Sequence, residues 1–242
     1  MSALLLIAHG SRDPRHAATV AALVEEVRAR RPGVEVATAY LDHCAPRIPQ
    51  VVGRLTDAVA VPLLLNRAFH AKHDIPAALH AAGSRLPVAD VLGPSPLLLA
   101  ALDRRLAGAG LDVSSPAVRA RTGVVLAAAG SSDPAADAAT RAVAAEWRRT
   151  RGWAAVEVAY ASAAGPRVPD ALAALRAVGA ERTAVSPYLL APGLLPDRIA
   201  AAADGADVLA DVLGAAPELA ALLLERHDEA RLAKRSAPAL TA

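Results

Sequence analysis

The chain has 242 residues, of which 54% are hydrophobic and 2% aromatic, and its 26 basic and 24 acidic side chains give a net charge of +2. This length suits two units of about 100–150 residues, and the apolar content excludes wholesale disorder. So few aromatic rings and so small a charge exclude a nucleic-acid binder that relies on base stacking or a basic surface. The single cysteine excludes an intramolecular disulfide framework. Because no apolar run approaches the roughly 18–20 residues of a membrane span, we expect a cytoplasmic protein without a membrane partner.

The first half of the chain alternates between apolar strands and helices. A strand at 3–8 precedes a helix at 15–30, which Asp13 or Ser11 can cap and which Pro14 can begin. The further predicted elements are a strand at 34–40, a helix at 46–59, a strand at 59–65, a helix at 75–82, a strand at 88–92 and a closing helix at 96–107. Continuous apolar strands are typical of parallel sheets that are buried on both faces. The predicted fold class is therefore α/β, with a four-stranded parallel sheet and helices on both faces.

The same order of motifs returns 120 to 125 residues later. Residues 4–14 (LLLIAHGSRDP) are matched by 124–134 (VVLAAAGSSDP), and shorter segments recur at nearly the same offset. Such repetition indicates a duplicated domain. We predict an N-terminal domain at 1–110 that carries the site, a degenerate copy at 122–228 and a flexible tail at 229–242, with a linker at 108–121 that is rich in Gly, Ser and Pro.

The two copies differ in the residues that are able to do chemistry. The turn glycine and the Asp-Pro pair that begins the helix are kept in both, so structural roles explain them. By contrast, His9 is replaced by Ala129 and Asp42 by Ser162, and the counterpart of 69–76 (FHAKHDIP) contains no histidine. We therefore place the chemistry mainly in the first half.

Candidate metal ligands follow three strands of the first half. His9 follows the first strand, Asp42 and His43 follow the second, and His70 and His73 follow the third. Because ligands bind beyond the carboxyl ends of parallel strands, we expect these side chains to share one cleft. Imidazoles beside a carboxylate suit Co²⁺, Fe²⁺, Ni²⁺ or Zn²⁺. The remaining histidines lie on predicted helices, where we expect exposure to solvent: His16, His80 and His227. Contact with the cleft is the alternative for His16, which lies one turn inside its helix.

Together, the segments 6–12 (LIAHGSR), 40–42 (YLD), 62–65 (PLLL) and 70–76 (HAKHDIP) closely resemble the sirohydrochlorin chelatases of the CbiX/SirB type, which are class II chelatases. The degenerate second copy resembles the long two-repeat form of that family, so the resemblance covers nearly the whole chain. It implies two similar α/β domains that face each other across a cleft. It also implies a lyase that inserts Co²⁺ or Fe²⁺ into sirohydrochlorin, for cobalamin or sirohaem biosynthesis.

The resemblance also assigns residues to roles. The family's two active-site histidines fall on His9 and His70, and its acidic residue falls on Asp42, where the family usually has the longer Glu. The histidines would hold the metal and accept the departing pyrrole protons, while Asp42 would supply a carboxylate oxygen or orient an imidazole. His73 and His43 are further ligands or partners of ligands. The residues expected to contact the substrate, whose carboxylates suit arginine, are Arg12, Ser11, Arg47, Arg67 and Phe69.

Some alternatives stay open at this stage. A non-catalytic protein that binds or delivers a divalent metal or a tetrapyrrole would need the same ligands. The metal is a substrate, Ni²⁺ is a further possibility, and no organic cofactor is expected. We expect a monomer, because the two halves can pair within one chain, and a homodimer is the alternative.

Overall fold

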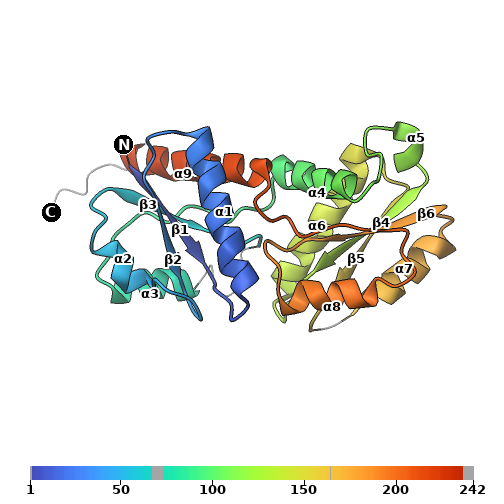
Figure 1. The fold of residues 1–242 in the computed structure, drawn as a ribbon, viewed down its shortest axis with the longest axis horizontal. Coiled ribbons are helices and arrows are strands. Elements are labelled where there is room, and N and C mark those ends of the chain that lie inside the picture. The colour runs from blue at the N-terminus through green and yellow to red at the C-terminus, as the bar shows by residue number, and fades with distance from the viewer. Residues whose placement is uncertain (1, 67–72, 164, 237–242) are drawn as a thin grey trace. The chain divides into compact units, whose positions relative to one another are not determined.

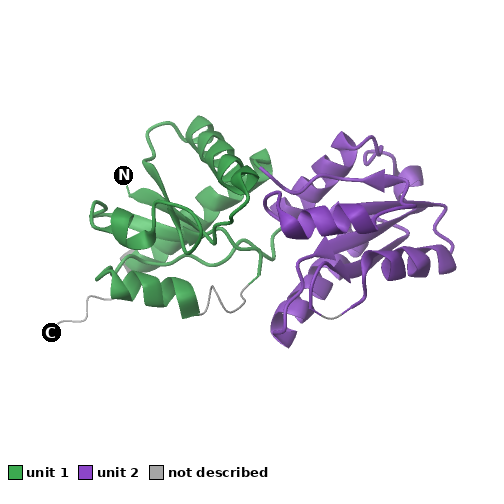
Figure 2. Ribbon diagram, turned by 60° about the horizontal axis from the view of Figure 1, so that its bottom comes forward, with its two compact units in different colours: residues 1–95, 215–242 green, residues 96–214 purple. Residues whose placement is uncertain are grey.

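The computed structural model describes residues 2–66, 73–163 and 165–236, so the predictions for Arg67, Phe69 and His70 lie outside the described residues. The chain forms two compact units, which Figure 2 distinguishes by colour. Unit 1 comprises 1–95 and 215–242, and unit 2 comprises 96–214. Both are parallel sheets covered by helices, which confirms the α/β class.

The elements are labelled in Figure 1. Unit 1 contains β1 (Ala3–Ala8), α1 (Pro14–Arg30), β2 (Val36–Tyr40), α2 (Ile48–Val52), β3 (Ala58–Pro62), α3 (Ile75–Ala81) and α9 (Pro217–Ser236). Unit 2 contains α4 (Pro96–Gly108), α5 (Pro116–Arg119), β4 (Thr122–Ala128), α6 (Pro134–Arg151), β5 (Ala155–Tyr160), α7 (Val168–Ala177), β6 (Arg182–Pro187), α8 (Leu194–Ala202) and β7 (Val208–Leu209).

The sheet of unit 1 has the order β2-β1-β3, with all strands parallel. Its central strand β1 is completely buried, as its continuous apolar sequence predicts. In the register, Ala8 lies opposite Tyr40 and Ile7 opposite Pro62. The three strands therefore end at one level, and the loops that follow them share one edge of the sheet.

The fourth strand predicted at 88–92 is wrong for unit 1, where that segment makes only an isolated bridge from Val88 to Ala60. Ala60 bonds to the chain on both sides of this bridge, donating to the carbonyl of Pro87 and accepting from the N–H of Ala89.

Beyond Pro62 the N–H groups of Leu92 and Gly93 donate to the carbonyls of Leu64 and Leu65. The difference from unit 2 lies before the bridge: the N–H of Asp207 donates to the carbonyl of Thr183 of β6, whereas that of its counterpart Leu86 donates to the hydroxyl of Ser84. Unit 2 has the four predicted parallel strands, in the order β5-β4-β6-β7.

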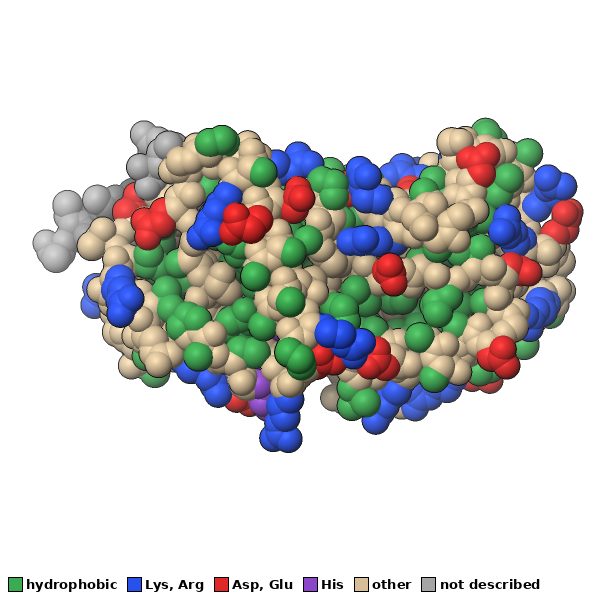
Figure 3. Space-filling model, in the orientation of Figure 1, with side chains coloured by type: hydrophobic (Ala, Val, Ile, Leu, Met, Phe, Trp, Pro, Cys, Tyr) green, Lys and Arg blue, Asp and Glu red, His purple; other side chains and the backbone are tan. Residues whose placement is uncertain are grey.

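The helices cover both faces of each sheet. In unit 1, Leu5 and Ile7 of β1 share a core with α2 and α3, while α9 packs against β3 and α1. In unit 2, Val125 and Ala127 of β4 share a core with α7 and α8. On the face drawn in Figure 3, acidic and basic side chains are interspersed, as the small net charge predicts.

The closing helices are exchanged between the two repeats. Helix α4 belongs by sequence to the first repeat, yet it lies in unit 2, where its Asp103 accepts hydrogen bonds from Trp147 Nε1 (2.8 Å) and Arg151 Nε (2.6 Å). Helix α9 belongs to the second repeat and lies in unit 1, where Asp228 accepts two bonds from Arg31 (2.8 and 2.7 Å). The boundaries 1–110 and 122–228 therefore describe the sequence repeats, and the compact units are divided elsewhere.

The segment from residue 229, which we expected to fray, is helical as far as Ser236. The carboxylate of Glu229 pairs with Arg226 (2.9 Å), and Lys234 lies 3.7 Å from Asp57, so both ends of this segment have ionic partners in unit 1. His227 is only 2% exposed, which contradicts the expectation of a solvated side chain. Within the described ranges, every helix is too short or too polar to span a lipid bilayer.

Candidate metal centre at the edge of the first sheet

The candidate site lies where the first sheet ends. His9 comes directly after β1, and Asp42 comes two residues after β2. The backbone N–H of Leu41 donates to the carbonyl of Ala8 (3.0 Å), and that of Asp42 donates to the carbonyl of His9 (2.8 Å). These bonds extend the β1–β2 pairing into the loops and bring His9 and Asp42 together, as the sequence predicts.

Gly10 permits this close approach of the two loops. Its φ is +92°, and a Cβ atom at this position would lie 1.8 Å from the carbonyl oxygen of Asp42. Its counterpart Gly130 has a φ of +90°, and a Cβ there would lie 2.3 Å from the carbonyl oxygen of Ser162. Because both copies share this geometry, the glycine serves the fold of the loop in each.

His43 stands edge-on to His9 in the loop after β2. The two ring centroids are 6.2 Å apart and the ring planes are inclined by 86°. Its Nε2 atom lies 3.6 Å from Oδ2 of Asp42. The structure therefore groups two imidazoles and one carboxylate at this edge.

The carboxylate of Asp42 is held by two donors although it is exposed. Its Oδ1 atom accepts from the backbone N–H of His43 (2.8 Å) and from Nη2 of Arg47 (2.9 Å). These two bonds, with the backbone bond the larger cause, hold the pKa of Asp42 below its usual range. Asp42 is consequently ionised at neutral pH.

Arg47 is directed back into its own loop. Besides Asp42, its guanidinium bonds to the carbonyl of Leu41. Arg167, its counterpart in the second copy, bonds to the carbonyls of Tyr160 (3.0 Å) and Ala163 (2.9 Å). Arg167 holds its loop in the same way although the second copy lacks the histidines, so this role of Arg47 is structural. Contact between Arg47 and the substrate stays a prediction.

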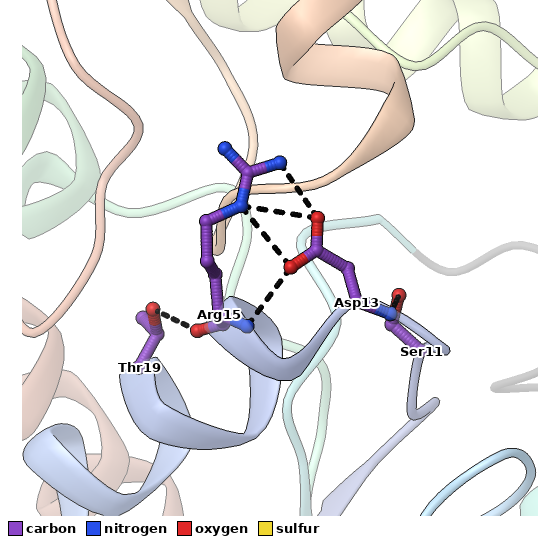
Figure 4. A network of polar contacts seen from close by, with 4 residues as sticks. All are labelled: Ser11, Asp13, Arg15 and Thr19. Carbon is purple, nitrogen blue, oxygen red and sulfur yellow. Dashed lines mark hydrogen bonds and ion pairs between the residues drawn. The ribbon is translucent and has the colours of Figure 1, made fainter.

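Ser11 and Asp13 form the turn that starts α1 (Figure 4). The hydroxyl of Ser11 accepts from the N–H of Asp13 (3.1 Å), and Asp13 caps the helix by accepting from the N–H of Arg15 (2.9 Å). The side chain of Arg15 also bonds to Asp13, and together these bonds lower the pKa of Asp13. Arg12 lies between these turn residues and is exposed. The predicted substrate contacts of Ser11 and Arg12 stay predictions, and only Arg12 lacks a role in the turn.

His16 lies beside the candidate site, on the first turn of α1. We expected exposure to solvent, whereas the side chain is half-buried in the first turn of α1, with its ring centroid 6.4 Å from that of Tyr40. Burial and the nearby charge of His9 lower its pKa, while Asp13 raises it. The sequence offered one signal that His16 lies near His9: it follows His9 by seven residues, just inside a helix that starts at the same sheet edge.

The third loop contributes least to the described site. His73 is exposed and lies just before α3. His70, Arg67 and Phe69 fall outside the described residues. Among the residues that are described, no three His, Cys, Asp or Glu side chains form a ready-made metal site. Two grooves of about 580 and 590 Å³, beside β5 and β2, contain none of the predicted site residues.

A family model described as CbiX matches the chain twice, at residues 3–109 and 123–230. A sirohydrochlorin ferrochelatase from Priestia megaterium is 28% identical, over 82% of this chain and 77% of that protein. A sirohydrochlorin cobaltochelatase from the same organism is 26% identical, over 95% of this chain and 80% of that protein.

Solved structures share the fold. The structure described as SirB from Bacillus subtilis with Fe³⁺ has a TM-score of 0.80, with 24% identity and coverage of 98% of both chains. A structure described as CbiX, the terminal enzyme for biosynthesis of siroheme in denitrifying bacteria, has a TM-score of 0.69, with 23% identity over 94% of this chain and 99% of that one. The double match of the family model confirms the duplication that the sequence predicts.

Proposed function

Since the CbiX model matches two consecutive segments that make up most of its length, the chain belongs to the CbiX family, and on this premise we propose that it inserts Co²⁺ or Fe²⁺ into sirohydrochlorin. The relatives whose names carry this activity include both a ferrochelatase and a cobaltochelatase. The observation that carries the proposal is the pair of backbone bonds that joins the loops of His9 and Asp42 at one sheet edge, in the copy that alone has both residues.

The chemistry of insertion fits these side chains. A tetrapyrrole loses two pyrrole N–H protons as the metal enters, and the cation loses part of its water. A neutral imidazole is able to hold the cation or to accept a proton, because its pKa lies close to neutrality. We assign these tasks to His9 and, by resemblance, to His70. Asp42 is ionised, and either gives the cation a carboxylate oxygen or orients an imidazole.

Sirohydrochlorin is recognised through its carboxylates in this proposal. Arg12 is exposed on the loop between His9 and α1, which supports a pairing with one of these carboxylates. Phe69 and Arg67 are assigned to the substrate from the sequence alone. The cleft between the domains, the monomeric state and the cytoplasmic location also stay predictions.

An anaerobic chelation assay tests the proposal. Sirohydrochlorin in excess over protein is mixed with Co²⁺, Fe²⁺ or Ni²⁺, and the absorption spectrum of the tetrapyrrole is followed. Many equivalents of metallated product per protein are expected. A single equivalent would instead identify a carrier of metal or tetrapyrrole.

Two histidine substitutions locate the activity. We expect His9→Ala and His70→Ala each to lower the rate by orders of magnitude without altering the circular dichroism spectrum. His80→Ala, on the exposed side of α3, is the matched control and keeps the full rate. Full activity in either of the first two variants would overturn the assignment.

A further inference from the structure

Strand β5 lies at one edge of the second sheet, whose order is β5-β4-β6-β7. Just after β5, the backbone N–H of Ala161 donates to the carbonyl of Ala128 in β4 (2.9 Å). Because the backbone N–H and C=O groups of a strand point alternately to its two sides, Val156, Val158 and Tyr160 direct theirs away from β4. These three residues therefore form the outer edge of β5.

The outer edge is covered at Tyr160 and open at Val156 and Val158. The N–H of Tyr160 donates to the carbonyl of Pro166 (2.9 Å), and its carbonyl accepts from Nη1 of Arg167 (3.0 Å). Within the described ranges, the outward backbone groups of Val156 and Val158 have no hydrogen-bond partner. Each of these two valines therefore offers one N–H and one C=O to a further strand.

A groove of about 580 Å³ runs along this open edge. It touches residues 156–158, which are consecutive in β5. Since successive side chains of a strand point to opposite faces of the sheet, a groove that touches all three residues includes the edge between the two faces. On its helical side, the groove is lined by exposed arginines of α6: Arg141, Arg148 and Arg149.

The acidic residue of the groove, Glu157, lies on the other face of the sheet. Along β5 it alternates with its neighbours and shares a face with Ala155 and Ala159, which pack in the core formed with α7 and α8. The side chain of Glu157 therefore points away from α6, and the α6 side of the groove is basic.

Arg148 carries the charge that is free to meet a ligand. Arg141 pairs with Asp137 (2.9 Å) and Arg149 pairs with Glu146 (2.7 Å), both along α6. Among the residues that the structure describes, the guanidinium of Arg148 has neither a hydrogen-bond nor an ion-pair partner. Its planar fork suits a carboxylate.

The first copy closes the equivalent position. Arg28, the counterpart of Arg148, donates to Glu25 (2.6 Å) and to the outward carbonyl of Val36 in β2 (3.2 Å). In the second copy Ala145 replaces Glu25, so the charge that holds Arg28 is missing there. The fold thus permits a covered edge, and the open groove is a property of the second copy alone. The second copy also has arginine where the first has alanine, at 141 against 21 and at 149 against 29.

The charges of the groove favour an acidic strand over a second copy of this chain. In an antiparallel pair of β5 strands related by two-fold symmetry, the α6 helices of both copies lie on the same face of the joined sheet. The arginines of the two grooves then face each other and repel. An extended segment with carboxylates on that face meets the opposite charge instead, and its backbone supplies the missing hydrogen bonds.

We propose that the open edge of β5 binds an acidic, extended peptide segment of a partner protein. The segment adds a short strand to the second sheet, bonds to the backbone of Val156 and Val158, and pairs a carboxylate with Arg148. This inference does not depend on the metal chemistry of the first copy. It gives the copy that lacks the histidines a binding role of its own.

Peptide binding to the full-length protein tests the proposal. The probe is a fluorescently labelled synthetic peptide of about eight residues in which Glu and Val alternate, and its anisotropy is followed. We expect Arg148→Glu to weaken binding about tenfold, because repulsion replaces an ion pair. Arg30→Glu, at an exposed arginine in the last turn of α1, is the matched control with the same change in net charge, and it should bind as the wild type does.

Amide hydrogen exchange separates strand addition from charge attraction alone. The bound peptide should slow exchange several-fold at the outward N–H groups of Val156 and Val158. The N–H of Glu157, which faces β4, should exchange as it does in the free protein. A peptide with Lys in place of Glu should bind about tenfold more weakly than the acidic peptide.

Three outcomes overturn the proposal. The first is binding of the acidic peptide that is absent in the wild type or equally strong in Arg148→Glu. The second is unchanged exchange at Val156 and Val158 in the saturated complex. The third is a dimer of the wild type, detected by analytical ultracentrifugation, in which these same two N–H groups are protected without peptide, since that result makes a second copy the occupant of the edge.

Discussion

A Cβ atom on Gly10 would lie 1.8 Å from the carbonyl oxygen of Asp42, so the loops after β1 and β2 pack with no room for any side chain between them. Gly10→Ala has to separate the two loops, and it also forces a left-handed alanine. We expect a loss of about 3 kcal/mol in the free energy of unfolding, measured with urea, and a near-complete loss of chelation.

Gly83→Ala provides the control for backbone strain. Gly83 has a φ of +68°, and no described atom lies within 4 Å of a Cβ placed there. Its substitution should cost only about 1 kcal/mol, the strain of a left-handed alanine. An equal loss in the free energy of unfolding for Gly10→Ala and Gly83→Ala would show that the contact with Asp42 does not prevent a side chain at residue 10.

The exchange of the closing helices predicts where core substitutions act. Leu102 of α4 and Leu223 of α9 are both fully buried. Replacing either by alanine should cost roughly 2–5 kcal/mol. Leu102→Ala, although it lies in the first repeat, should speed amide hydrogen exchange in β4, β5 and β6. Leu223→Ala should speed exchange in β1, β2 and β3, and the reverse pattern would contradict the division into units.

The pair Arg31–Asp228 predicts an acid-dependent contribution to stability. Its hydrogen bonds lower the pKa of Asp228 to about 2, with Arg31 the largest cause. Because the pKa falls on folding, the pair stabilises unit 1 fully above the ordinary aspartate pKa of about 3.9, and this contribution is lost as the pH falls towards 2. Both side chains are about one-third exposed, so solvent screening reduces the contribution to about 1 kcal/mol.

Arg31→Met measures this contribution. At pH 7 the variant should unfold about 1 kcal/mol more easily than the wild type, and at pH 2.5 the difference should fall to about one-third of that. Denaturant unfolding at the two pH values gives both numbers. A difference that does not change with pH would mean that the two side chains act through packing.

Arg47 and Arg167 should behave alike if both serve their loops. Each donates to two acceptors in the loop before its helix. We expect Arg47→Ala and Arg167→Ala each to lower the free energy of unfolding by about 1–2 kcal/mol. A rise in the KM for sirohydrochlorin with Arg47→Ala, without any loss of stability, would instead support the substrate contact predicted from the sequence.

Arg12 should show the opposite behaviour. Its side chain is exposed and takes no part in the turn formed by Ser11 and Asp13. Arg12→Ala should therefore raise the KM for sirohydrochlorin several-fold and leave the unfolding curve unchanged. Arg12→Lys should recover only part of the affinity, because lysine lacks the planar fork that matches a carboxylate. An unchanged KM would remove Arg12 from the site.

Local signals in the sequence were sufficient for much of the fold. Asp13 and Pro14 mark the start of α1 to within one residue, because a cap and a proline act on their own neighbours. The helix predicted at 46–59 was too long, since α2 ends at Val52, where Gly53 follows and the chain turns towards β3. The missing fourth strand depends on the backbone N–H of Leu86, which donates to Ser84, whereas that of its counterpart Asp207 donates to Thr183 of β6.

In the candidate site too, local sequence signals predict some features and not those that depend on residues distant in the chain. Strand order and the loss of His9 and Asp42 in the second copy were enough to place these residues together. The partial burial of His16 depends on Tyr40, which comes from a different strand. The burial of His227 depends on a helix that crosses to the other repeat's unit, and local periodicity carries no information about that crossing.

The exchanged helices also determine the order in which the units can fold during synthesis. Unit 2 is one continuous stretch of chain, while unit 1 needs both its first residues and α9. At the usual 5–20 residues per second, the ribosome takes roughly 6–24 s to make the residues of unit 2. For all of that time the face of β3 that packs against α9 is uncovered, so the half that leaves the ribosome first is completed last. The degenerate repeat is thus indispensable to the nascent protein, because the histidine-bearing unit cannot close its core until that repeat has been translated.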